Sequence, residues 1–115
     1  MESFEAAAAL GALAHEGRLD IYRLLVQAGP AGLTVGDIGA KLKMPGATLS
    51  FHLAQLQHAD LVAARREGRQ LIQTADFAQM NALVAYLTEN CCGGKSCAPV
   101  CAPPPARKTK PRRKK

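Results

Sequence analysis

Hydrophobic residues recur with helical spacing along most of the first 90 positions of this 115-residue chain. Ala and Leu dominate residues 2–14, and Leu19, Tyr22 and Val26 share one face of a second stretch, residues 16–28. This spacing is close to the 3.6-residue turn of an α-helix. The pattern therefore predicts two helices, followed by a Gly-Pro-Ala-Gly break that ends the second one.

Two further helices are expected after the break. Thr34 and Asp37 stand three residues apart, as in a capping box, and indicate the start of a short third helix. Residues 46–58 follow Pro45, which is suited to a first helical turn because its missing N–H would be unpaired there. This stretch carries three leucines at positions i, i+4 and i+7: Leu49, Leu53 and Leu56. They predict one buried stripe, with the remaining side chains left to other faces.

Residues 61–74 change to a strand pattern. They predict two short strands joined at Glu67-Gly68, because Gly68 can take the positive φ of a tight turn. A last helix is expected from Asp76, a suitable N-cap, and to run into the cysteines. Its apolar residues share one face: Phe77, Met80, Val84 and Leu87. The predicted fold class is mostly α with a two-stranded β-wing, in the element order of a winged helix-turn-helix.

This element order points to double-stranded operator DNA as a partner. The helix at 46–58 can enter a major groove, and the arginine-tipped hairpin can contact the neighbouring backbone or minor groove. The expected DNA-binding residues come from both elements: Thr48, Ser50, Phe51, His52, Gln55, Arg65, Arg66 and Arg69. An ordinary polar helix face and a solvated turn explain the same pattern, and His52 is alternatively a partly buried packing residue.

Charge divides the chain into parts. The formal net charge is +6, but the last nine residues alone contribute +7, so the rest carries −1. The expected organisation is a DNA-binding and dimerisation domain at 1–90, a cysteine-rich segment at 91–101 and a disordered basic Pro/Lys/Arg tail at 102–115. The sequence contains no apolar run of membrane-helix length, and Glu2 and Glu5 disfavour a signal peptide, so a reducing cytoplasm is expected.

Three segments resemble the ArsR/SmtB family of bacterial metal-sensing repressors: "ALAHEGRLDIYRLLV", "LTVGDIGAKLKMPGATLSFHLAQLQHADLV" and "ARREGRQLIQT". The resemblance covers residues 8 to about 88 and implies a winged-helix homodimer formed through its first and last helices. Apolar faces around Phe4, Ala8 and the last helix agree with that interface. The chain departs from the family in the recognition helix, where Gly46-Ala47 replaces a frequent Gln-Ser and Phe51 a frequent Arg.

All four cysteines fall within thirteen residues: Cys91, Cys92, Cys97 and Cys101. The family's other metal positions are empty here, since the third helix has no thiol and the last helix no histidine. Clustered soft thiolates suit a thiophilic ion, and As(III), or Sb(III), is satisfied by three of them. Adjacent cysteines converge only at a frayed helix end, which Gly93-Gly94 permits. Some arsenic-responsive members of the family carry a similar Cys-Cys pair and a later Cys, which implies Cys91, Cys92 and Cys97 as ligands, with Cys101 as alternative or fourth.

Several alternatives stay open for the cluster. All four thiols can hold Zn²⁺ or Cd²⁺, although the usual C-x2-C pairs are missing. A disulfide or persulfide switch would use the same cysteines. A further alternative is that the cysteines belong to a tail without a function of its own. A thiol enzyme is disfavoured, because a nucleophilic cysteine gains from a helix N-terminus and these follow a C-terminus. A non-specific architectural DNA-binding protein driven by the basic tail is a further possibility. The sequence thus predicts a non-enzymatic repressor with As(III) as inducer.

Overall fold

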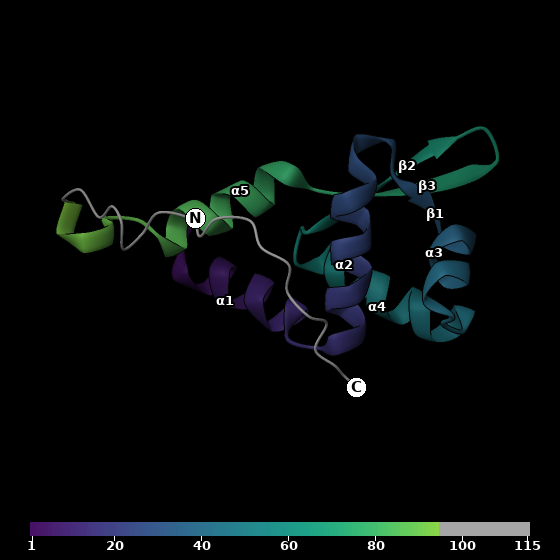
Figure 1. Cartoon of the computed structure of the whole chain (residues 1–115), viewed down its shortest axis with the longest axis horizontal. Helices are drawn as coiled ribbons and strands as arrows, with labels where there is room; N and C mark the ends of the chain where they lie inside the picture. The colour runs from purple at the N-terminus through teal and green to yellow at the C-terminus, as the bar shows by residue number, and fades with distance from the viewer. Residues whose placement is uncertain (95–115) are drawn as a thin grey trace, which may run out of the picture.

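The computed structural model of the chain describes residues 1–94. Within them the chain forms five α-helices, a three-stranded sheet and two short 3₁₀ helices (Figure 1). The helices are α1 Ser3–Leu13, α2 Glu16–Ala28, α3 Val35–Leu42, α4 Gly46–His58 and α5 Phe77–Leu87. The strands are β1 Leu33–Thr34, β2 Val62–Glu67 and β3 Gln70–Ala75, and the 3₁₀ helices are η1 Gly29–Ala31 and η2 Cys91–Gly94.

The predicted helix starts are confirmed by their caps. At α3, the Thr34 side chain accepts a hydrogen bond from the Asp37 N–H, and the Asp37 carboxylate accepts one from the Thr34 N–H, which completes the capping box. At α5, the Asp76 side chain accepts from the Gln79 N–H. Each cap satisfies donors that the first helical turn leaves unpaired.

The sheet contains one strand more than predicted. Strands β2 and β3 pair antiparallel, with Glu67 opposite Gln70, so Gly68 and Arg69 form the two-residue turn of the hairpin. Gly68 has the expected positive φ, 64°. The short β1 pairs with the other edge of β3, which gives the order β1-β3-β2. Two residues are too few to show a period along the sequence, so β1 could not be predicted.

The core lies between α2, α4 and the sheet. The predicted stripe of α4 is confirmed, because Leu49, Leu53 and Leu56 are all buried. The face predicted for α2 is partly wrong. Tyr22 is buried and Val26 half-buried, but Leu19 is exposed, and Ile21 and Leu25 are the side chains of α2 that are fully buried.

The folded structure of the described residues is elongated, with two opposite ends (Figure 1). At one, which we call the wing end, lie the turn between α3 and α4 and the tip of the β2–β3 hairpin. At the other, the cysteine end, lie the start of α1, the end of α5 and η2. The predicted boundaries near residues 90 and 102 remain predictions, and the tail at 102–115 lies outside the described residues.

Candidate nucleic-acid interface and thiol site

The first half of α4 offers an exposed surface at the wing end. Thr48, Ser50 and Phe51 are exposed, as predicted. The helix begins after Pro45, whose side chain provides no cap hydrogen bond. The first N–H groups of α4 therefore have no side-chain acceptor from the cap residue, an arrangement that favours an anion such as a DNA phosphate.

His52 does not lie on this surface, and the prediction that it faces outward is wrong. Its side chain is only 7% exposed. The His52 ring packs against that of His15 at the start of α2, with 4.6 Å between ring centroids. His15 Nδ1 accepts a hydrogen bond from the Gly17 N–H, whereas buried His52 Nδ1 has no partner among the residues described. The alternative role, helix packing, is the one its position supports.

Burial and neighbouring charge act in the same direction on this ring. Desolvation is the largest effect, followed by the charges of His15 and Arg18, and together they lower the pKa of His52. Each of the three disfavours the imidazolium form. His52 is therefore expected to be neutral in the folded protein near neutral pH.

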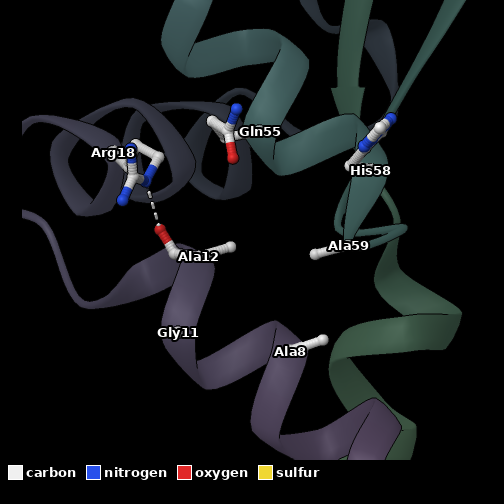
Figure 2. A pocket seen from close by; sticks show the side chains of 7 residues that line it. All are labelled: Ala8, Gly11, Ala12, Arg18, Gln55, His58 and Ala59. Atoms are coloured by element: carbon white, nitrogen blue, oxygen red, sulfur yellow. Dashed lines mark hydrogen bonds between the residues drawn. The ribbon is translucent and has the colours of Figure 1, made fainter.

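Gln55 is exposed one turn after Phe51, on the same side of α4, and lies toward α1. Figure 2 shows it with Arg18 and His58 around a shallow pocket between α1, α2 and the end of α4. Across this pocket, Arg18 Nε donates a 2.7 Å hydrogen bond to the Ala12 carbonyl. Gln55 thus lies beside the junction of the first helices, one turn farther along the same exposed side of α4 as Phe51.

Arg65 has a structural contact that the sequence did not suggest. Its guanidinium donates to the carbonyl oxygens of Pro30 and Ala31, at 3.0 and 3.2 Å, and to the Glu67 carboxylate at 2.8 Å. These bonds tie the hairpin to η1. Because the same donors would be needed to bind a phosphate, Arg65 is better placed to hold the wing than to contact DNA.

Arg66 and Arg69 are the exposed cations of the hairpin. Neither forms an ion pair or side-chain hydrogen bond within residues 1–94. Lys41 and Lys43, which the sequence interpretation missed, are exposed at the end of α3 and in the turn that leads to α4. The signal that could have found them is their position beside the recognition helix. The two elements bring positive charge to the wing end, as contact with a phosphate backbone requires.

The vicinal cysteines lie beyond the last helix rather than in it. Helix α5 ends at Leu87, and Cys91 and Cys92 follow in η2, where Cys92 and Gly93 have φ values of 56° and 67°. The prediction that α5 runs into the cysteines is therefore wrong, but the predicted non-helical turn at the pair is present. Within that turn the two Sγ atoms lie 3.8 Å apart.

At this distance the two sulfur atoms are in contact but are not bonded to each other, since a disulfide bond is about 2.05 Å long. Two thiolates bound to one tetrahedral ion at about 2.3 Å lie about 3.8 Å apart, so the turn brings the sulfurs to a distance suited to chelation. Cys91 is in a disulfide bond, and only its reduced form would offer a thiolate. Within residues 1–94, the His, Cys, Asp and Glu side chains form no group of three able to hold a metal ion. The other expected ligands, Cys97 and Cys101, lie outside the described residues.

An exposed apolar surface links α1 and α5. In α1, Phe4 is 74% exposed. In α5, Leu87 is 57% exposed, and Val84, three residues before it, is also exposed. The two helices meet through a 2.6 Å hydrogen bond between the Ser3 and Tyr86 hydroxyl groups. No helix within residues 1–94 is both long and apolar enough to cross a membrane.

Comparison with known proteins agrees with this architecture. A family model for a helix-turn-helix domain matches residues 13–65. The transcriptional activator HlyU of Vibrio cholerae is 32% identical over 85 residues, which cover 74% of this chain and 76% of HlyU. The structure of reduced HlyU from the same organism is similar, with a TM-score of 0.59 and 30% identity over 78% of this chain and 92% of HlyU.

Two further solved structures share the fold. An ArsR-like transcriptional regulator from Rhodococcus sp. RHA1 has a TM-score of 0.65 and 28% identity, covering 72% of this chain and 76% of that one. A homodimeric winged helix-turn-helix DNA-binding domain from Mycobacterium bovis has a TM-score of 0.59 and 32% identity, covering 79% and 84%. The chain belongs to the ArsR/SmtB family of winged-helix transcriptional regulators.

Proposed function

We propose that this protein is a homodimeric repressor that binds operator DNA and releases it when As(III) binds its reduced cysteines. Cys91, Cys92 and Cys97 supply three thiolates, with Cys101 as alternative or fourth ligand, and Sb(III) is a second possible inducer. The observation that carries the proposal is the 3.8 Å separation of the Cys91 and Cys92 sulfurs in a non-helical turn. Thiolates select thiophilic ions of this kind.

The dimer is proposed to form through α1 and α5. Phe4, Val84 and Leu87 present apolar surface without cover from the described chain, and such surfaces mark interaction sites. A homodimeric relative of the same fold supports a twofold arrangement. Two copies of α4 would then address the two halves of a palindromic operator.

The coupling between ligand and DNA is proposed to pass through α5. The cysteines follow its end closely, and α5 contributes to the proposed interface. Pulling the turn around an ion would shift α5 and so alter the spacing of the two wing ends. By linkage, operator DNA must weaken As(III) binding by the same factor as As(III) weakens operator binding.

The test uses the reduced full-length protein and the duplex that it enriches most from a random DNA pool. We expect arsenite to release wild-type protein from this duplex, measured by fluorescence anisotropy. The Cys91→Ser, Cys92→Ser double variant should bind the duplex equally well but stay bound. Release of the double variant by arsenite would refute the site.

X-ray absorption on the arsenite-loaded protein identifies the remaining ligand. Cys97→Ser and Cys101→Ser are matched variants, and three sulfur neighbours should be lost in only one of them. Four sulfur neighbours around a zinc ion that co-purifies with the protein would favour a Zn²⁺ or Cd²⁺ site instead.

A second candidate function is thiol redox sensing, in which two thiols lose two electrons and two protons to an oxidant and form a disulfide. The disulfide-bonded state of Cys91 favours it. Diamide, a thiol oxidant, distinguishes the two functions. Release by diamide that dithiothreitol reverses, with no response to arsenite, supports the redox switch.

A further inference from the structure

The outward face of α4 is unusual in its chemistry. At about 100° per residue, Phe51 lies about 200° around the helix from Leu49 and Leu53, so it points directly away from the buried stripe. Its ring is 58% exposed. Exposed Ala47 and Ala54 stand four residues before it and three residues after it, on the same face.

The exposed ring is therefore flanked by two alanines on one side, and by Thr48 and Gln55 on the other. Two alanines allow the helix to approach another surface closely, with Phe51 as the projecting group. The nearest polar groups are Thr48, three residues before Phe51, and Gln55, four residues after it.

The surroundings indicate what this apolar face contacts. It lies on the helix that begins at the wing end, where Lys41, Lys43, Arg66 and Arg69 are exposed. Exposed cations on the neighbouring elements favour a polyanion over an apolar protein surface. In the major groove of DNA, the apolar feature that distinguishes bases is the C5-methyl group of thymine, which Phe and Ala side chains contact.

We propose that Phe51, framed by Ala47 and Ala54, determines operator specificity by contacting thymine methyl groups in the major groove. The inference rests on the proposed operator binding and adds a chemical basis for the choice of operator sequence. Hydrogen bonds from Ser50 and Thr48 supply the polar part of recognition. Each operator half-site should then contain at least one A·T pair at which the methyl group, rather than the hydrogen-bonding edge, is recognised.

Deoxyuridine tests this directly, because it lacks only the methyl group of thymine. The duplex that the wild-type protein enriches from a random pool is prepared with uracil at each thymine in turn, and dissociation constants are measured by anisotropy. We expect at least one thymine per half-site at which uracil weakens binding about fourfold, the contribution of one buried methyl group. Phe51→Ser should bind the thymine and uracil duplexes equally.

The matched control is Leu19→Ser, which removes another exposed apolar side chain, on α2. It should retain the wild-type penalty for uracil. If the wild-type protein enriches a sequence but uracil has no effect at any thymine, or if Phe51→Ser keeps the penalty, the inference is overturned while operator binding stands. If no sequence is enriched, the proposed function fails and the inference fails with it.

Discussion

The wing end and the cysteine end of this protein are held together in different ways. The sheet that carries the wing end is held on several sides: β3 pairs on both edges, Arg65 binds two carbonyl oxygens of η1, and Gln57 Nε2 donates a 2.9 Å hydrogen bond to Gln73 Oε1. At the cysteine end, Leu83 is the one buried side chain of α5, and the rest of that helix is exposed or half-buried.

Positive φ values are more concentrated at the cysteine end, although Lys43 in the turn between α3 and α4 also has a positive φ, 54°. Past α5, Asn90, Cys92 and Gly93 all have positive φ, two of them without the freedom of glycine. Such conformations cost about 1 kcal/mol or more each for residues with a side chain. A segment with few packed contacts is one that a ligand can rearrange at low cost. The difference between the ends thus separates a fixed DNA-binding frame from an adjustable input.

The largest predicted effect is at the wing end, for Gly32→Ala. Gly32 has a φ of 70°, and a Cβ there would lie 2.5 Å from the Gln73 carbonyl oxygen and 2.6 to 2.7 Å from the Thr74 and Ile72 side chains. Backbone strain and overlap together should lower the free energy of unfolding by about 3 kcal/mol. Urea denaturation measures it.

Gly68→Ala is the matched control, since it has a similar positive φ but open space around its Cβ. It should cost about 1 kcal/mol. Equal losses in the two variants would show that the close approach of Gly32 to β3 contributes nothing to stability.

Much of the wing end could be predicted because its signals are local. The capping pairs, the leucine stripe of α4 and the glycine of the hairpin turn all act within a few residues of chain. The role of Arg65 could not be predicted, because its carbonyl partners lie 35 and 34 residues earlier. Only the folded sheet brings η1 beside the hairpin.

The burial of His52 was missed for a related reason. Helical spacing identifies the stripe at Leu49, Leu53 and Leu56, but it does not say which neighbour covers the flanks of that stripe. Here the start of α2 covers one flank, and Gly17 lets the His15 and His52 rings approach. At the cysteine end, the sequence predicted the convergence of the adjacent thiols but placed the helix end too late.

The next largest effect should be on the proposed dimer, with Leu87→Glu. If Leu87 is buried between two copies, removing its apolar surface costs about 2 kcal/mol, so the dimer dissociation constant should rise about thirtyfold. Analytical ultracentrifugation measures this change. Monomer stability should barely change, because Leu87 is exposed within one chain.

Leu19→Glu provides the comparison, since Leu19 is also exposed but belongs to α2. It should leave the dimer intact. A dimer that tolerates Leu87→Glu as well would place the subunit interface elsewhere and remove the proposed link between the cysteines and the wing ends.

A smaller effect should separate the arginines of the hairpin. Arg65→Ala removes the bonds to Pro30 and Ala31 and should lower the free energy of unfolding by about 1 kcal/mol. Arg66→Ala should leave stability unchanged but weaken binding to all DNA sequences alike. In a plot of the logarithm of the binding constant against the logarithm of the salt concentration, the negative slope should become shallower by about 0.9 for each phosphate contact removed. Loss of DNA affinity without loss of stability in Arg65→Ala would reverse the two roles.

The smallest predicted effect concerns His52, which joins α2 to α4. Burial, then the charges of His15 and Arg18, lower the pKa of His52 below its ordinary 6.5. The unfolded chain therefore binds this proton more readily than the folded one. The contribution to stability is complete above pH 6.5, is lost progressively as pH falls from 6.5 toward the lowered pKa, and is constant below it.

Urea midpoints measured between about pH 7.5 and pH 5 should thus fall more steeply in the wild-type protein than in His52→Gln. His58→Gln is the matched control, because His58 is exposed and should leave the steeper profile in place. Identical profiles for the wild type and His52→Gln would mean that the buried ring gains its proton without cost. The junction of α2 and α4 would then be as adaptable as the cysteine end, and the contrast between the two ends would apply only to the sheet.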